Sequence, residues 1–358
     1  MRVYNFAAGP ATMPLEVLEE AQSQLSDWDS LGMSVMEVSH RSKEFVSVAD
    51  EATSLMRELM GIPEGYSVLF LQGGASGQFS AIPQNLTAPG DTVDIVNTGS
   101  WSKKAIAEAK KYVSVNVVAD EKASNYSTVP DAASLAQTPG AAYFHYTANE
   151  TIGGVEFDYV PDVDAALICD MSSTIMSRPI DVSKFGLIYA GAQKNLGPAG
   201  ITVVIVRDDL TGNARPETPS VWDYAQMAAA DSMLNTPPTL ALYLLNLTLK
   251  WVKKNGGLEG MAARNQAKAA KLYEAIDNSD FYSNPVAPNA RSWMNVPFLV
   301  ADPSLEKEFV SSAADAGLTN LSGHRSVGGM RASIYNAMPP EGVDALIDFM
   351  KEFEQKHA

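Results

Sequence analysis

The sequence is poor in cysteine, basic residues and long apolar runs. Its 358 residues include one cysteine, Cys169, which excludes an internal disulfide framework and any metal site built from several cysteines. A lone thiol suits a reducing compartment. Lys and Arg number 26 against 42 Asp and Glu, for a formal charge of −16. Because phosphate-backbone binding needs clustered Lys and Arg, this balance argues against a nucleic-acid partner.

Targeting and membrane signals are also missing. The first residues, MRVYNFAAGPATMP, contain no apolar segment or cleavage pattern typical of a signal peptide. No run of about 18 apolar residues is present, so we expect no membrane span. We therefore predict a cytoplasmic protein. The composition is that of a globular chain, with 46% hydrophobic and 19% charged residues, and the length favours two domains.

The pattern of apolar residues predicts an α/β fold. Helices are expected at 14–28, 45–60, from 76 onward, and at 103–112. Apolar runs typical of strands occur at 67–71, 92–96, 113–118, 141–146, 165–168 and 187–190. Strands that alternate with helices indicate a mostly parallel sheet with helices on both faces. The run 201–206 follows the previous strand after only about ten residues, too few for a helical crossover, so we predict one reversed strand in a mixed sheet.

The last third of the chain has a different pattern of predicted helices and strands. A long helix is expected at 240–254, and Asn255-Gly256-Gly257 marks its end. Beyond it we predict helices at 260–276, 305–316 and 341–354, and strands at 293–300 and 330–335. These elements indicate a smaller C-terminal α+β domain. The predicted division is a large α/β domain at 14–255 and a small domain made of 1–13 and 256–358.

Ligands of open α/β sheets bind beyond the carboxyl ends of the strands, so ligand-binding residues are expected in the loops at those ends. Gln72-Gly73-Gly74-Ala75-Ser76 follows one strand and opens a helix, which is typical of an anion cradle but also of a simple tight turn. The sequence there lacks the glycine-rich patterns of nucleoside-triphosphate and dinucleotide sites.

Three further side chains follow strands at the same edge. Trp101 is either a packed aromatic or a flat face for a planar ligand. Asp170 is either a helix cap or the partner of a positively charged ring nitrogen. Lys194 is either a surface lysine or an amine activated by burial for attack on a carbonyl. Together with the glycine turn, these groups could bind the four parts of pyridoxal 5′-phosphate (PLP). The glycine turn suits its phosphate, Trp101 its ring face, Asp170 its ring nitrogen and Lys194 its aldehyde.

Nine segments carry a resemblance to a known family. They are FAAGPATMP, HRSKEF, FLQGGASGQF, NTGSWS, NETIGG, CDMSSTIMSRPID, AGAQKNLGPAG, NTPPT and GGMRASIYNA. In this order, from residue 5 onward, they resemble the phosphoserine aminotransferases, which are fold-type-I PLP enzymes of class V. The resemblance implies transfer of an amino group between glutamate and 3-phosphohydroxypyruvate, giving phosphoserine and 2-oxoglutarate in serine biosynthesis. It also implies 4-phosphohydroxythreonine, from pyridoxine biosynthesis, as a second product.

The resemblance assigns the cofactor residues. Lys194 would hold PLP and move the proton, with Asp170 at the ring nitrogen and Trp101 against the ring. Thr151 would bond the phenolic oxygen. The phosphate would be bound by Ala75, Ser76 and Gln193 and, from the other subunit, by Asn235 and Thr236. A homodimer with shared sites is therefore implied.

The substrate residues are also implied by the family. Both substrates carry two anionic ends, and arginine binds carboxylate and phosphate in bidentate fashion. Arg331 corresponds to the arginine for the α-carboxylate; the group for the second anion is His40, Arg41, His324 and Arg325. His40 and Arg41 would come from the other subunit, and Arg325 is as readily a solvated loop charge.

The sequence departs from the family at two places. Many members have Arg where this chain has Ser76, which moves the binding of the substrate anion toward His40, Arg41 and His324. The start reads FAAGP where serines are common. Two alternative functions stay open: another fold-type-I PLP aminotransferase or lyase with a different acidic substrate, and a non-catalytic protein that binds the cofactor.

Overall fold

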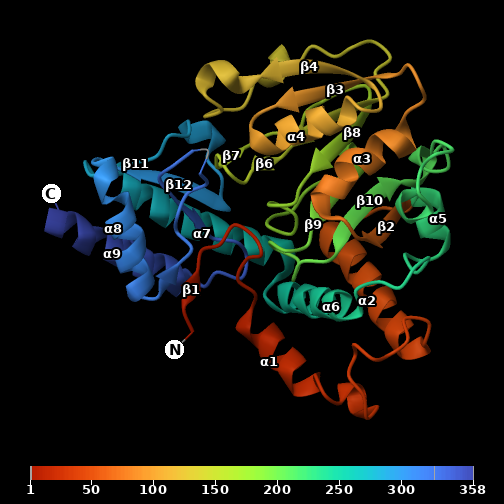
Figure 1. Ribbon diagram of the computed structural model, residues 1–358, viewed down its shortest axis with the longest axis horizontal. Coiled ribbons are helices and arrows are strands. Elements are labelled where there is room, and N and C mark those ends of the chain that lie inside the picture. Colours follow the sequence, from red (N-terminus) through yellow and green to blue (C-terminus); the bar gives the residue numbers. More distant parts are fainter. Residues whose placement is uncertain (1, 326, 358) are drawn as a thin grey trace.

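The computed structural model describes residues 2–325 and 327–357, and its centre is a sheet of seven strands (Figure 1). Their order across the sheet is β2-β10-β9-β8-β5-β3-β4. The bounds are β2 Tyr66–Leu71, β3 Thr92–Asn97, β4 Ser114–Asp120, β5 Tyr143–Thr147, β8 Ala166–Asp170, β9 Leu187–Gly191 and β10 Thr202–Arg207. All neighbouring pairs are parallel except those of β10, which runs antiparallel to both β2 and β9. The predicted mixed sheet with one reversed strand is therefore confirmed.

Helices cover both faces of this sheet. Their bounds are α1 Leu15–Gln24, α2 Lys43–Met60, α3 Gly74–Leu86, α4 Ser100–Ala109, α5 Tyr224–Ala229 and α6 Thr239–Lys254. One apolar cluster joins α3, α4 and α5 to one sheet face, with Phe79 and Ile95 among its members. A larger cluster joins α2 and α6 to the other face through residues such as Phe45 and Leu242. Because each strand points alternate side chains to these two faces, both are buried, as the continuous apolar runs indicate.

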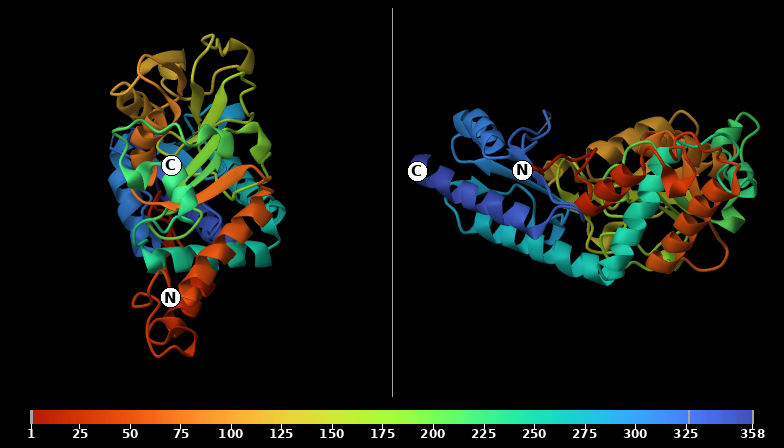
Figure 2. Two further views of the ribbon diagram at one scale, coloured as in Figure 1. Left: turned by 90° about the vertical axis from the view of Figure 1, so that its right-hand side faces the viewer. Right: turned by 90° about the horizontal axis from the view of Figure 1, so that it is seen from below.

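A second, smaller lobe is built from the C-terminal part of the chain (Figure 2). It contains the antiparallel sheet β11-β12-β14, with strands Tyr282–Ser283, Asn295–Val300 and Met330–Ser333. Its helices are α7 Gly257–Asp277, α8 Glu306–Asp315 and α9 Pro340–His357. The N-terminal strand β1, Tyr4–Asn5, pairs with β13, Leu318–Thr319, and Phe6 is buried in the apolar cluster of this lobe, so residues 4–6 pack with the C-terminal part of the chain.

Helix α7 connects the two lobes. Its first turns place Leu258 and Met261 in the cluster of the large lobe, whereas Ala269 and Leu272 lie in the cluster of the small lobe. The helix begins directly after Gly256, whose φ of +89° suits glycine. The division of the chain into two domains near this residue stays a prediction. Within the described ranges, no helix combines the length and apolarity that crossing a bilayer requires.

Candidate active site

A cavity lies at the carboxyl ends of β5, β8 and β9, where the strand rule predicts a ligand. Seven residues that the sequence singled out line it: Ala75, Ser76, Trp101, Thr151, Asp170, Gln193 and Lys194. The other lining residues are Gly74, Thr147, Asn149, Ser172 and Ser173. Segments that are far apart in the chain thus meet around one space.

Lys194 follows β9, and its amino group points into this cavity. Its Nζ donates a hydrogen bond to Thr151 Oγ1 over 2.6 Å. Burial lowers the pKa of the Lys194 amine to about 8, the nearby carboxylates of Asp170 and Glu150 raise it, and the charge of Arg331 lowers it further. A substantial fraction of the amine is therefore neutral near pH 8, and the neutral amine is the form that attacks carbonyl carbon.

Asp170 ends β8 and is 4% exposed. Its Oδ1 accepts a hydrogen bond from the Ser172 backbone N–H over 2.9 Å. Burial raises the pKa of Asp170, while the bonds to Ser172 and the charge of Lys194 lower it. Turns, not a helix, follow the strand, so Asp170 is not a helix cap. A buried carboxylate in this position needs a cationic partner, which a protonated ring nitrogen would supply.

Trp101 lies in the first turn of α4, although the sequence pattern predicts that this helix begins only at Lys103. The helix begins at Ser100 because the Glu150 carboxylate accepts bonds from the N–H groups of Trp101, at 2.9 Å, and Ser102, at 2.8 Å. Close packing accompanies this cap, since a Cβ on Gly99 would lie 2.6 Å from Glu150 Cδ. The capping residue Glu150 is distant in sequence, so the local sequence pattern predicts the start of the helix too late. It fixes the Trp101 ring at the cavity wall.

The glycine turn forms the opposite end of the cavity. Gly73 and Gly74 have φ values of +100° and +65°, and α3 begins at Gly74, two residues before the predicted start. Ala75 and Ser76 therefore occupy the first turn, where helical N–H groups have no partner within the helix. No acidic side chain occupies that turn. These donors and the helix dipole favour a phosphate at this position.

Arg331 does not itself line the cavity, but it extends from the small lobe to Thr151, one of the lining residues. It lies on β14, and its Nη1 donates to the Thr151 backbone oxygen over 3.3 Å. Its Nε is buried and has no hydrogen-bond partner among residues 2–325 and 327–357. Burial lowers the pKa of this guanidinium. An anion held between the two lobes would satisfy both the charge and the free donor.

Comparisons with known proteins agree with this geometry. The family profile described as Aminotransferase class-V matches residues 3–346. A phosphoserine aminotransferase of Hahella chejuensis is 55% identical over 358 residues, covering 100% of this chain and 99% of the relative. One of Nitrosomonas europaea is 55% identical over 366 residues and is covered completely in both chains. The chain belongs to the phosphoserine aminotransferases, a family within class V.

Solved structures show the same fold over the whole chain. The phosphoserine aminotransferase of Bacillus circulans subsp. alkalophilus is 49% identical, with a TM-score of 0.98, and the match covers 100% of this chain and 99% of that one. The PLP-bound phosphoserine aminotransferase of Trichomonas vaginalis is 46% identical, with a TM-score of 0.94 over 98% of this chain and 100% of that one. The predicted fold class is confirmed, and this chain is an aminotransferase.

Besides Arg331, six further predicted residues do not line the cavity within this single chain. His40 and Arg41 lie in the turn before α2, and His324 and Arg325 lie in the loop between β13 and β14. The remaining two are Asn235 and Thr236. Asn235 lies beside the glycine turn, because its Nδ2 donates to Gln72 Oε1 over 3.1 Å. The roles of all six in ligand binding stay predictions.

Several residues that build the site were not predicted from the sequence. Glu150 was considered only as part of the segment NETIGG, although an acidic residue three positions after the end of a buried strand is itself a signal. Ser172 and Ser173, which line the cavity, were likewise quoted only within a motif. His145 and Tyr189 lie beneath Asp170 inside apolar runs and gave no local signal.

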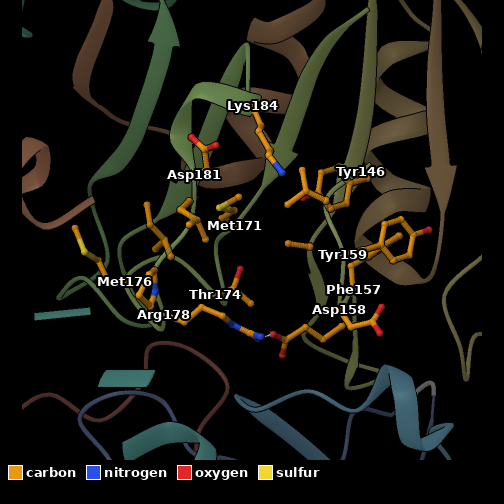
Figure 3. Close-up of a pocket in the computed structure, with 16 residues that line it drawn as sticks. Tyr146, Phe157, Asp158, Tyr159, Met171, Thr174, Met176, Arg178, Asp181 and Lys184 are labelled. Carbon is orange, nitrogen blue, oxygen red and sulfur yellow. Dashed lines mark ion pairs between the residues drawn. The ribbon is translucent and has the colours of Figure 1, made fainter. Parts of the chain in front are cut away.

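A second hollow opens on the other face of the sheet (Figure 3). Tyr146 and Met171 line it, and strand alternation points them away from the side of Asp170. At its base the guanidinium of Arg178 pairs with the Glu156 carboxylate, as the dashed line in Figure 3 marks. The Arg178 Cζ also lies 4.0 Å from the ring centroid of Trp293. This hollow is separate from the Lys194 cavity.

The pKa of Lys194 predicts how cofactor uptake depends on pH. Only the neutral amine attacks an aldehyde. If Lys194 binds PLP, as the sequence predicts, the rate at which the protein takes up added PLP should rise about tenfold per pH unit below pH 8 and level off above it. Glu150→Gln removes a carboxylate that raises this pKa and should move the midpoint to lower pH. Stopped-flow absorbance across pH 6–10 measures both profiles, and a rate independent of pH would contradict the assignment.

Proposed function

We propose that this aminotransferase binds PLP in the Lys194 cavity and transfers the amino group of L-glutamate to 3-phosphohydroxypyruvate, forming O-phospho-L-serine and 2-oxoglutarate. One observation carries the proposal: Lys194, Asp170, Trp101 and the α3 N-terminus line a single cavity, each in a position that matches a different part of PLP. The identity of 55% to phosphoserine aminotransferases over the whole chain supports the substrate pair.

The residues present fit the cofactor. The unpartnered N–H groups of Ala75 and Ser76 would hold its phosphate, with Gln193 nearby, and Asp170 would keep the ring nitrogen protonated. Thr147 Oγ1, which lines the cavity, is buried with no hydrogen-bond partner in the described part of the chain, so polar capacity remains for a ligand. Bound PLP supplies an electron sink that stabilises negative charge at the substrate α-carbon.

The protein's own groups supply the rest of the chemistry. The Lys194 amine would hold the cofactor and would be the base that carries a proton from the substrate α-carbon. The Trp101 ring, at the cavity wall beside the Glu150 cap, would cover one face of the cofactor and exclude water there. Thr151 would bond the phenolic oxygen, a role for which its hydroxyl, 2.6 Å from Lys194 Nζ, is already placed.

The substrate anions would be bound by cationic side chains. Arg331 is assigned to the α-carboxylate because its guanidinium adjoins Thr151 at the cavity edge. The second anion, phosphate or the side-chain carboxylate, would be bound by His40, Arg41, His324 and Arg325. In a chain of charge −16, such a group of cations provides a local attraction for dianionic substrates.

Purified protein, reconstituted with PLP, tests the reaction directly. Supplied with glutamate and phosphohydroxypyruvate, it should produce 2-oxoglutarate, measured by a coupled dehydrogenase assay. Unphosphorylated hydroxypyruvate and glyoxylate are the comparison acceptors, because a different aminotransferase would prefer one of them. Failure to produce 2-oxoglutarate from the phosphorylated acceptor would refute the substrate assignment.

Replacing Arg331 tests the carboxylate site. Arg331→Ala removes one partner of a desolvated ion pair, which costs about 2–5 kcal/mol, so kcat/KM for glutamate should fall by roughly 30-fold to several thousandfold. The loss should fall mainly on KM, and PLP binding should be retained. Arg207→Ala, at an arginine that pairs with Asp209 outside the cavity lining, gives a matched comparison, and an Arg331→Ala variant with unchanged kcat/KM would reject this role.

A homodimer with shared sites is the assembly we propose. From α1 to the start of α2 the surface exposes an unusual number of large apolar side chains: Leu15, Leu18, Leu25, Leu31, Met33, Met36 and Val46. His40 and Arg41 belong to the same stretch, and exposed Leu234 adjoins Asn235. Exposed apolar surface of this extent favours association, and a twofold interface would bring these residues to the partner's cavity.

Mixing two inactive variants tests the shared sites. One variant is Lys194→Ala; the other replaces both Asn235 and Thr236 with Ala. If each site combines residues of two subunits, a mixed dimer contains one complete site, and equilibrated mixtures should recover about a quarter of wild-type activity. Activity measured after subunit exchange that stays at the level of the separate variants would show that the sites are not shared.

A further inference from the structure

Three strands place a row of polar groups directly beneath the ring position of the proposed cofactor. On β9, Tyr189 pairs with Asp170 of β8. On β5, Thr147 pairs with Asp170, and His145 lies two residues before it on the same face. Tyr189 and Asp170 therefore lie side by side at one register position, and His145 lies on the next strand, two residues before that position, on the face opposite the hollow of Figure 3.

His145 and Tyr189 are both buried and are in contact with each other. His145 Nε2 lies 2.9 Å from the Tyr189 hydroxyl oxygen. Tyr189 is 0% and His145 3% exposed, so water does not compete for the bond. Tyr189 lies beside Asp170 on the neighbouring strand, and its hydroxyl lowers the pKa of that carboxyl. On this face of the sheet, His145 contacts Tyr189 and Asp170 lies beside it, while Tyr143 and Tyr224, which add to burial in raising the pKa of Tyr189, make no hydrogen bond to it within the described residues.

The direction of the hydrogen bonds follows from what each group can donate. Burial lowers the pKa of His145 to about 4, so the imidazole is neutral and carries one proton. Its Nδ1 has no partner in the described ranges, whereas Nε2 faces Tyr189, so the proton belongs on Nε2. The His145 N–H then donates to the Tyr189 oxygen, and the Tyr189 hydroxyl is left to donate toward Asp170.

We infer that His145 and Tyr189 are positioning residues that hold Asp170 as a carboxylate and thereby keep the ring nitrogen of the bound cofactor protonated. The pair touches neither the substrate nor the cofactor. Aligned donors in a buried chain polarise one another, so the negative charge of Asp170 is stabilised more strongly than by Tyr189 alone. The inference rests on the proposed binding of PLP and adds two residues to that site.

Tyr189→Phe and His145→Leu test the chain of bonds. A hydrogen bond to a buried charged group contributes enough that PLP should bind about tenfold more weakly to the Tyr189→Phe apoprotein. Loss of positive charge on the ring also makes the Lys194 nitrogen of the holoenzyme harder to deprotonate, so the pH midpoint of the cofactor's absorbance change should move upward. Equilibrium dialysis and a spectrophotometric pH titration give these two readouts independently of turnover.

Two further variants serve as controls. Tyr143→Phe removes a buried phenol hydroxyl from the same face of β5, away from Asp170, and should behave as wild type. His145→Gln keeps an N–H donor and should restore part of what His145→Leu loses. Thermal unfolding of each apoprotein shows that the variants fold.

The outcomes separate this inference from the proposed function. If the wild-type protein takes up no PLP, the proposed function fails. If wild type takes up PLP but Tyr189→Phe and His145→Leu match its affinity and midpoint, the positioning role is wrong. Equal shifts in Tyr143→Phe and Tyr189→Phe would also overturn it, because the effect would then be a general one of losing a buried hydroxyl.

Discussion

Lys194→Ala is expected to reduce transamination by at least about 10³-fold, because one change removes both the group that holds the cofactor and the base that carries the α-proton. No other amine can take over within the described chain, since the cavity lining contains no second lysine. The substitution leaves the fold intact, because the Lys194 side chain makes its hydrogen bond to Thr151 alone and the loop is held by backbone contacts such as Lys194 N–H to Ala192 O.

Steady-state assays with glutamate and phosphohydroxypyruvate measure this loss, and borohydride reduction followed by mass spectrometry shows whether the cofactor is attached. Lys103→Ala is the matched control: this lysine lies over the Tyr126 ring, outside the cavity, and its loss should leave kcat unchanged. Turnover by Lys194→Ala within tenfold of wild type would contradict the assigned role.

The fold was predictable to the extent that it depends on the local pattern of apolar residues and on the lengths of the links between elements. The short link before β10 correctly implied a reversed strand, and Asn255-Gly256-Gly257 correctly marked the end of α6. Helix starts were less predictable. Helix α4 begins three residues before its predicted start because Glu150, from another part of the chain, satisfies its first N–H groups.

The candidate site was predictable because of a topological rule. Parallel strands deliver their carboxyl ends to one edge, so a polar residue after each apolar run is expected near the others. That rule finds Asp170 and Lys194, but it gives no signal for His145 and Tyr189, whose pairing depends on strand register. In the homodimer that we propose, the positions of His40 and Arg41 relative to a substrate would depend on the second subunit, which no pattern within one chain can place.

Asp170→Asn should lower kcat by roughly 10²–10³-fold, the usual effect of removing one preorganised electrostatic group. Asparagine keeps the shape and an oxygen to accept from the Ser172 N–H, but it cannot hold a proton on the ring nitrogen. Burial disfavours the Asp170 charge, so the apoprotein should unfold at an unchanged or higher temperature, which separates function from folding. Calorimetry and assays measure both effects, with the exposed Asp158→Asn as control. Loss of activity together with marked destabilisation would show instead that Asp170 serves the fold.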